Sequence, residues 1–260
     1  MMDSTGIQRL LDIMAQLRDP QNGCPWDLKQ TYQSIAPHTI EEAYEVADCI
    51  ECDDLDHLPG ELGDFLFQVV FYAQLAKEEG RFEFQDIVNA ICDKLVRRHP
   101  HVFADQKFET TEELSKAWEG FKEQERGGRT EAGVFADIPN ALPAMTRSRK
   151  IQARAVRQGF DWSETSQAVA KIDEELSELK HEANNNGKAA RLEHELGDLL
   201  FSCVGLARRL KIDAEQALRK ANERFMQRFQ TMQQLVVDDG KSFEDCALET
   251  MLVYWNKTKT

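Results

Sequence analysis

The chain has 260 residues and 42% of them are hydrophobic, which is enough to bury the core of one large domain or two moderate ones. Its formal net charge of -14 repels a phosphate backbone, which argues against a protein that binds nucleic acid polymers. The longest apolar stretch, residues 65–76, is too short to span a membrane, and the six cysteines fall mostly in apolar stretches, as in proteins of a reducing compartment. We therefore expect a cytoplasmic protein with no membrane partner.

Apolar residues recur at helical spacing from the N-terminus onward, beginning with Ile7, Leu10, Leu11, Met14 and Leu17. Runs that alternate between apolar and polar residues, as half-buried strands do, are nearly absent. We therefore predict an all-α protein. Proline and glycine mark a first loop at residues 19–25, and the pair His99-Pro100 marks the end of a later helix.

A polar segment at residues 126–133, which contains three glycines, divides the chain. We place an N-terminal domain at residues 1–125, a linker at residues 126–143 and a C-terminal domain at residues 144–260. All seven prolines precede residue 144, so the C-terminal domain is free to form long uninterrupted helices.

One acidic pattern occurs in both halves of the chain. It reads Glu41-Glu42-x-x-Glu45 and then Glu61-x-x-Asp64 in the first half, and Glu174-Glu175-x-x-Glu178 and then Glu195-x-x-Asp198 in the second. The similarity extends to residues 60–67, which match residues 194–201, and to all four tryptophans, which fall at paired positions. We infer two tandem copies of one helical unit, each resembling a four-helix bundle.

The acidic pattern predicts a cage of carboxylates between two helices of each copy. Residues three or four apart lie on one face of a helix, so each motif presents its acids in one direction. Neighbouring carboxylates in a low-dielectric interior are stable only when protonated or when they share a hard divalent cation such as Mg²⁺. The predicted metal ligands are Glu175, Glu178, Glu195 and Asp198, with a second possible site at Glu42, Glu45, Glu61 and Asp64.

A solvated acidic helix face is the ordinary explanation for a single Glu-x-x-Asp motif. Here Asp64 and Asp198 each begin a nearly continuous apolar run, which predicts burial of the helix on all sides and favours the metal site. A di-iron carboxylate bundle remains an alternative, although it expects Glu-x-x-His twice and only Glu178 and His181 provide it. A non-enzymatic helical scaffold whose acids bind stabilising ions is the third possibility.

Basic residues occur one helical turn from several of these acids. Lys171 precedes Glu175 by four residues and Arg191 precedes Glu195 by four. Further along the chain, the same spacing relates Arg224 to Arg228 and Trp255 to Lys259. Each pair alone is typical of a surface ion pair, but together the cations favour phosphate binding beside a metal, with Trp255 as a stacking surface for a base.

The doubled motif resembles that of the all-α nucleoside triphosphate pyrophosphohydrolases, and residues 6–260 as a whole resemble the two-domain bacterial MazG family. The resemblance implies a homodimeric, Mg²⁺-dependent enzyme, with Mn²⁺ as a substitute, that cleaves a nucleoside triphosphate between the α and β phosphates. We predict catalysis by Glu174, Glu175 and Glu178, with Glu174, four residues before Glu178 on the same helix, orienting the attacking water or accepting its proton. The resemblance assigns the metal to the four C-terminal acids. It assigns substrate binding to Lys171, Arg191, Arg224, Arg228, Trp255 and Lys259.

The two copies differ at the positions of the predicted phosphate ligands. Where the second copy has Lys171 and Arg191, the first has His38 and His57. Histidine is largely neutral near pH 7 and reaches less far than lysine or arginine. We therefore expect the C-terminal copy to be the active one, and the N-terminal copy to support dimerisation or regulation.

Overall fold

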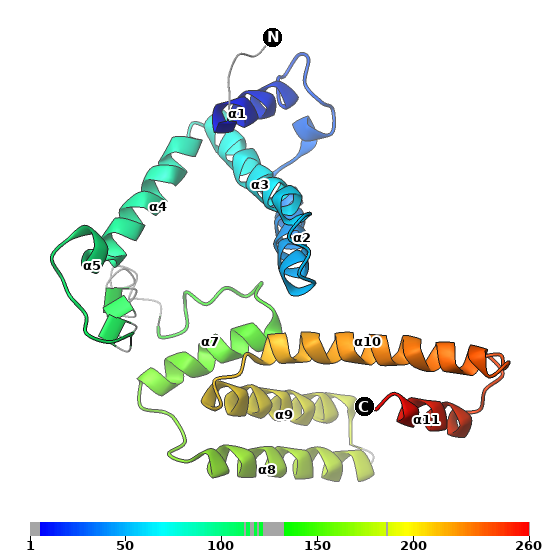
Figure 1. Cartoon of the computed structure of the whole chain (residues 1–260). Coiled ribbons are helices and arrows are strands. Elements are labelled where there is room, and N and C mark those ends of the chain that lie inside the picture. The colour runs from blue at the N-terminus through cyan, green and yellow to red at the C-terminus, as the bar shows by residue number, and fades with distance from the viewer. Residues whose placement is uncertain are drawn as a thin grey trace. The chain divides into compact units, whose positions relative to one another are not determined.

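A computed structural model describes residues 6–111, 113–114, 117–118, 120–121, 133–185 and 187–259. The chain divides into two compact units, residues 1–128 and 129–260 (Figure 1). Every regular element of the described residues is a helix, so the predicted all-α class is confirmed. Residues 122–132, which include the predicted domain boundary at residue 125 and the start of the predicted linker, lie outside the described residues.

The N-terminal unit is built around a helical hairpin of α2 and α3. Its elements are α1 (Gly6–Leu17), η1 (Asp27–Lys29), α2 (Tyr32–Glu51), α3 (Leu58–Glu78), α4 (Phe84–Arg98) and α5 (Pro100–Phe103). Helix α1 packs against α3, and α4 contacts α3 and α5 (Figure 1). The core lies where α1, α2 and α3 meet and contains Met14, Ile35, Val70, Phe71 and Leu75.

Local interactions fix both ends of the first connection in this unit. Thr31 begins α2 with a capping box, in which its hydroxyl accepts from the backbone N–H of Ser34 at 3.2 Å and its own N–H donates to the Ser34 hydroxyl at 2.8 Å. Arg18, which is 9% exposed, donates to Glu78 and to the backbone carbonyl of Asp27. This arginine therefore ties the loop after α1 to the end of α3.

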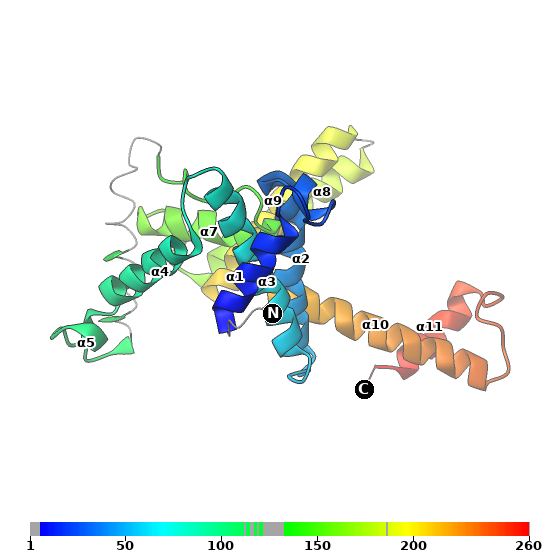
Figure 2. The same cartoon turned by 90° about the horizontal axis from the view of Figure 1, so that it is seen from above.

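The C-terminal unit repeats the hairpin with α8 and α9. Its elements are α7 (Ala144–Arg157), α8 (Thr165–Asn184), α9 (Ala189–Arg209), α10 (Ala214–Asp238) and α11 (Leu248–Lys257). Helix α7 packs across α9, and α10 contacts both α7 and α9. Helix α11 lies beside the far half of α10, away from α8, as Figures 1 and 2 show. A second apolar cluster joins these two helices through Met232, Val236 and Tyr254.

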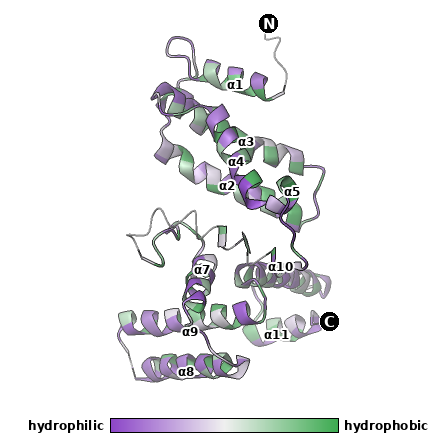
Figure 3. Cartoon of the chain, turned by 90° about the vertical axis from the view of Figure 1, so that its left-hand side faces the viewer, coloured by the Kyte–Doolittle hydropathy of each residue, from purple (hydrophilic) through white to green (hydrophobic). Residues whose placement is uncertain are grey.

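Hydrophobic and hydrophilic residues are mixed along the helices of both units (Figure 3). This distribution is the pattern of amphipathic helices that bury one face and leave the other in water. Among the helices that the structure describes, none combines the length and the hydropathy needed to cross a bilayer.

Candidate metal and nucleotide site

Three of the predicted metal ligands come together between α8 and α9. Glu175, Glu195 and Asp198 each offer a carboxylate oxygen, and these oxygens all lie within 4.8 Å of one another. Glu175 is 5% exposed and Glu195 is 4% exposed, while Asp198 is half-buried. Two buried carboxylates at such short range repel each other unless a cation or a proton is shared between them. We refer to these three residues as the C-terminal acidic cluster.

Glu178, the fourth predicted ligand, lies at the edge of this cluster on the exposed side of α8. Partial burial raises the pKa of its carboxyl above the ordinary value, and the negative charges of Glu175 and Glu195 raise it further. The four acids therefore interact electrostatically, even though only three of them converge on one point. Their oxygen atoms are the ligand type that Mg²⁺ prefers, so the donor set fits this ion.

Two cations pair with the cluster from neighbouring turns of the same helices. Nζ of Lys171 lies 2.8 Å from Oε1 of Glu175 and 2.9 Å from Oε1 of Glu174. The hydrogen bonds to Glu175 and then to Glu174 raise the pKa of this lysine, so it stays charged. Nη2 of Arg191 lies 2.9 Å from Oε1 of Glu195. The structure thus places Lys171, Arg191 and Glu174 at the acidic cluster, where the sequence predicted them.

The N-terminal unit contains the equivalent acids in a more exposed setting. Carboxylate oxygens of Glu42, Glu61 and Asp64 lie within 4.8 Å of one another, while Glu45 is exposed beside them. Burial raises the pKa of Glu42, and its hydrogen bond to Glu45 raises it further. Gln68 donates to Glu42 at 3.3 Å. The N-terminal acids therefore form a cluster of their own.

The two histidines that stand where the C-terminal copy has Lys171 and Arg191 pair with acids outside that cluster. His38 lies 3.4 Å from Glu41, and His57 lies 2.8 Å from Asp54. The second contact raises the pKa of His57. In the C-terminal unit, by contrast, Lys171 and Arg191 contact the cluster acids themselves. The difference between the copies thus extends beyond residue type to the choice of partner.

The predicted substrate ligands of α10 and α11 form a separate group. The guanidinium carbon of Arg228 lies 4.1 Å from the centroid of the Trp255 ring, and its Nε donates to Thr258 at 3.2 Å. The ring of Phe225 also packs against the indole, with 5.3 Å between the two ring centroids. Arg224 and Lys259 are exposed. Among the described contacts of Arg224, Arg228, Trp255 and Lys259, none reaches the C-terminal acidic cluster.

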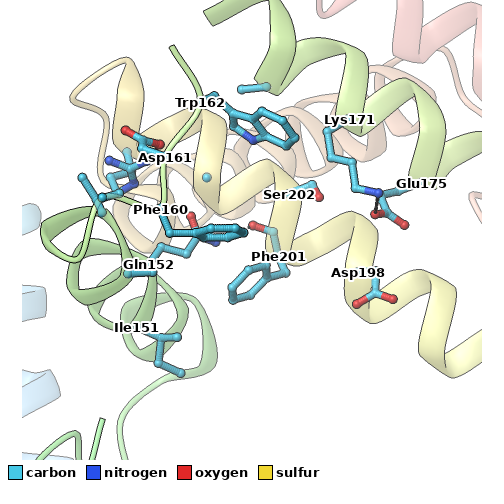
Figure 4. Close-up of a pocket in the computed structure, with 16 residues that line it drawn as sticks. Ile151, Gln152, Phe160, Asp161, Trp162, Lys171, Glu175, Asp198, Phe201 and Ser202 are labelled. Carbon is cyan, nitrogen blue, oxygen red and sulfur yellow. Dashed lines mark hydrogen bonds and ion pairs between the residues drawn. The ribbon is translucent and has the colours of Figure 1, made fainter. Parts of the chain in front are cut away.

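A cavity of about 390 Å³ opens beside the acidic cluster, between α7, α8 and α9 (Figure 4). Lys171, Glu175 and Asp198 line one end, and the aromatic rings of Phe160 and Phe201 line the other. Its size falls in the range of small-molecule sites. The sequence did not predict this cavity, although Trp162 of its loop is one of the four paired tryptophans.

The loop that carries Phe160 and Trp162 is held firmly at both ends. It begins at Gly159, whose φ of +87° suits glycine, and the N–H of Phe160 reaches back to the carbonyl of Ala155 at 3.0 Å to close the helix end. Asp161 then accepts from Arg208 of α9 at 2.6 Å. Burial is the largest single influence on this carboxyl and raises its pKa. The hydrogen bond and charge of Arg208, the backbone N–H of Trp162 and the charge of Arg209 together outweigh burial, so the pKa is lowered.

Comparison with known proteins places both units in one group of enzymes. The sequence profile of the MazG nucleotide pyrophosphohydrolase domain matches residues 30–103, and that of phosphoribosyl-ATP pyrophosphohydrolase matches residues 146–225. One match in each half confirms the predicted tandem repeat of all-α units.

Full-length relatives are also similar. A nucleoside triphosphate pyrophosphohydrolase of Escherichia coli (strain K12) is 52% identical over 254 residues, which cover 97% of both chains. A nucleoside triphosphate pyrophosphohydrolase/pyrophosphatase MazG of Thermotoga maritima is 42% identical over 260 residues, which cover 99% of this chain and 98% of that protein. The uncharacterized protein YabN of Bacillus subtilis is 39% identical over 95% of this chain and half of its own length.

Proposed function

This chain belongs to the MazG family of nucleoside triphosphate pyrophosphohydrolases, and on that premise we propose that its C-terminal unit performs a Mg²⁺-dependent cleavage between the α and β phosphates. The products are a nucleoside monophosphate and pyrophosphate. The protein is therefore a hydrolase that acts on nucleoside triphosphates. The convergence of Glu175, Glu195 and Asp198 between two helices is the observation that carries the proposal.

We propose that Glu175, Glu178, Glu195 and Asp198 hold the Mg²⁺. The raised pKa of Glu178 and the burial of Glu175 and Glu195 support this assignment, because carboxylates in such a setting are stabilised by a cation. When bound there, Mg²⁺ offsets the charge of the phosphates and lowers the pKa of the attacking water. Mn²⁺ accepts the same oxygen ligands and is expected to replace it.

Lys171 and Arg191 are the proposed contacts to the triphosphate at this site. Both are charged and lie within hydrogen-bonding distance of the cluster carboxylates. In this proposal they exchange these partners for phosphate oxygens when substrate arrives. Fixed cations at the leaving pyrophosphate stabilise the charge that develops in the transition state more than they stabilise the ground state.

Glu174 is the proposed group that orients the attacking water or accepts its proton. Its carboxylate is exposed on α8 and lies 2.9 Å from Nζ of Lys171. A carboxylate that already accepts from a charged lysine is available to accept from water at the same edge of the cluster. Glu175 and Glu178 contribute to catalysis by shaping the electrostatics of the reacting centre.

We propose that the chain acts as a homodimer. Large apolar side chains are exposed on α9, α10 and α11, including Leu196, Phe225 and Leu252. Because Arg224, Arg228, Trp255 and Lys259 have no described contact with the acids of their own chain, we assign them to the site of the second chain. There Arg224, Arg228 and Lys259 supply further positive charge for the triphosphate.

We propose that the N-terminal unit supports assembly or regulation, with its acids as a possible second metal site. Its cluster keeps three converging carboxylates, but His38 and His57 pair with acids outside the cluster.

We place the reaction in the cytoplasm, since the six cysteines of the described residues are free thiols.

The di-iron alternative is weakened by the position of His181. Both ring nitrogens of this histidine face the side-chain amide of Asn185, at 3.2 and 3.4 Å, on the turn that follows. No described contact joins these nitrogens to the acidic cluster.

Incubation with ATP and Mg²⁺ tests the proposed pyrophosphohydrolase activity, with AMP and pyrophosphate as the expected products. If the chain is instead a helical scaffold without activity, Mg²⁺ raises its melting temperature and a nucleoside triphosphate raises it no further.

A further inference from the structure

His194 lies one helical turn before Asp198 on α9, and the two side chains are in contact. Nε2 of the imidazole lies 3.3 Å from Oδ2 of the carboxylate. We propose that His194 is a positioning residue, which holds the Asp198 carboxylate in the orientation in which this acid binds Mg²⁺. This role rests on the proposed function for the metal site, and it does not depend on the cleavage reaction.

The contact completes a pattern that includes all three acids of the C-terminal acidic cluster. Each acid has a nitrogen-bearing side chain four residues earlier on its own helix, at a distance of 3.3 Å or less. Residues four apart lie on one face of a helix, so each partner reaches its acid from the preceding turn. The pairs are Lys171 with Glu175, Arg191 with Glu195, and His194 with Asp198.

The N-terminal unit lacks this arrangement at the equivalent positions. Gly60 precedes Asp64 by four residues and has no side chain that could contact the acid. The histidines at the other two positions, His38 and His57, pair with acids outside the N-terminal cluster. A partner one turn before each converging acid is therefore specific to the C-terminal unit, in which the reaction is proposed.

Asp198 is the cluster acid that such a partner restricts most. Glu175 and Glu195 are 5% and 4% exposed, so the packing of the hairpin already limits their rotation. The side chain of Asp198 is 46% exposed, and fixing a mobile side chain on a metal costs conformational entropy. Because the contact with His194 limits this motion before an ion binds, part of that cost is removed from the binding step.

An imidazole suits this role better than the longer cations at the other two positions. A neutral imidazole can carry its proton on Nε2 and donate it to a carboxylate, so the contact does not require a positive charge that competes with the metal. The ring of His194 also has a shorter reach than the side chains of Lys171 and Arg191, which are the proposed contacts to the triphosphate. We therefore expect His194 to act through Asp198 and not on the substrate.

Binding of Mn²⁺ to the full chain tests this role, because EPR of the free ion measures affinity without turnover. All chains also carry Glu42→Gln, which removes one carboxylate of the N-terminal cluster. Loss of a group that orients a metal ligand typically weakens metal binding by about tenfold or more, so His194→Leu is expected to weaken Mn²⁺ binding by about tenfold. His194→Gln keeps an N–H donor of similar reach and is expected to bind Mn²⁺ within about twofold of the chain that retains His194.

His181→Leu is the matched control, because it makes the same substitution at an exposed histidine of α8 that has no described contact with the cluster. This variant is expected to bind Mn²⁺ like the chain that retains both histidines. The role is overturned if His194→Leu binds Mn²⁺ with full affinity. It is also overturned if His194→Gln loses as much affinity as His194→Leu, because a donor at this position then does not position Asp198.

The Mg²⁺ dependence of pyrophosphate release separates positioning from contact with the substrate. His194→Leu is expected to need about tenfold more Mg²⁺ for half-maximal activity, and to reach the kcat of the unaltered chain once Mg²⁺ saturates. A lower kcat/KM for ATP at saturating Mg²⁺, with full Mn²⁺ affinity, overturns the role and assigns His194 to the substrate. If the unaltered chain releases no pyrophosphate from ATP, the proposed function fails, while the Mn²⁺ affinities still decide the role of His194.

Discussion

The ammonium group of Lys171 lies 2.8 Å from Oε1 of Glu175, a carboxylate that is 5% exposed and one helical turn further along α8. Arg191 contacts Glu195 in the same way on α9, at 2.9 Å. Each buried acid of the cluster thus has a long, charged side chain within reach. A side-chain cation that pairs with a proposed metal ligand is also close enough to contact a phosphate group bound to a metal ion at that site.

Replacing Lys171 with methionine separates these two roles. Lys171→Met removes the charge and keeps the length of the side chain, so Mg²⁺ loses a competitor for Glu175 while the triphosphate loses a contact. We expect Mg²⁺ affinity to stay equal or rise, and kcat/KM for ATP to fall by about a hundredfold. Calorimetric titration with Mg²⁺ and a pyrophosphate-release assay measure the two effects.

Lys180→Met is the control, because this lysine is exposed on the same helix and is expected to change neither quantity. A fall in Mg²⁺ affinity that accounts for the whole loss of activity contradicts the phosphate-binding role of Lys171. That result indicates instead that the lysine only shapes the carboxylates around it.

The two copies of the motif provide a matched pair of substitutions. Glu178→Gln and Glu45→Gln change equivalent acids by the same chemistry, one in each unit. We expect Glu178→Gln to abolish most pyrophosphate release, because it removes a proposed metal ligand that interacts with Glu175 and Glu195 of the C-terminal acidic cluster. Glu45→Gln is expected to leave most activity in place. A larger loss with Glu45→Gln assigns the reaction to the N-terminal unit.

Mixing two inactive chains tests the contribution of α10 and α11 across a dimer. Arg228→Ala removes a proposed phosphate contact, whereas Glu175→Gln removes a proposed metal ligand in the cluster. If Arg228 serves the site of the second chain, a mixed dimer carries both defects in one site and leaves the other site intact. We therefore expect co-expressed variants to recover a fraction of the activity, measured against each variant alone.

The recovery requires subunit exchange or co-expression, so the mixed species is isolated with two affinity tags before the assay. Activity at the level of the single variants is the contradicting outcome. It places Arg228 in the site of its own chain, or shows that the chain acts as a monomer.

The contact between Asp161 and Arg208 makes a prediction about acid stability. The pKa of the Asp161 carboxyl is lower in the folded chain than in the unfolded chain. The stability that this carboxylate contributes is therefore fully present above its ordinary pKa and is lost as pH falls through the lowered value. Asp161→Asn is expected to reduce the free energy of unfolding by about 1 kcal/mol near pH 7. The difference from the unaltered chain then shrinks toward about pH 3.

Denaturant unfolding of both proteins across this pH range measures the difference, with Asp173→Asn on an exposed face of α8 as the control. A difference that stays constant down to low pH indicates that the charge of Asp161 does not stabilise the fold. The loop that presents Phe160 and Trp162 is then held mainly by its backbone contacts.

Much of the fold and of the acidic cluster was predictable from the sequence because the relevant signals are local. Helical spacing alone puts Glu195 and Asp198 on one face, and the apolar run after Asp198 predicts burial of the helix. Because the same two acidic motifs recur in each copy, the repeat then indicates that the helix with Glu175 packs against the helix with Glu195 and Asp198. These inferences need only the period of the helix and the order of the residues.

Other features depend on packing between distant segments and were not predictable in this way. The cavity exists because Gly205 and Ala168 face a loop from α7, which the spacing of residues does not reveal. Likewise, no sequence rule states that His57 pairs with Asp54 and not with a cluster acid. The position of Arg228 against Trp255, apart from the cluster, follows from how α11 packs on α10.

Phosphorus NMR of ATP hydrolysis in isotopically labelled water tests the central claim most directly, because it reports both the products and the phosphorus atom that water attacks. With Mg²⁺, the unaltered chain is expected to give pyrophosphate and AMP that carries the label, and to give neither after EDTA treatment. Glu175→Gln is expected to be inactive, while its N-terminal counterpart Glu42→Gln keeps most of the activity. Formation of ADP and phosphate, or full activity in Glu175→Gln, contradicts a pyrophosphohydrolase centred on the C-terminal acidic cluster.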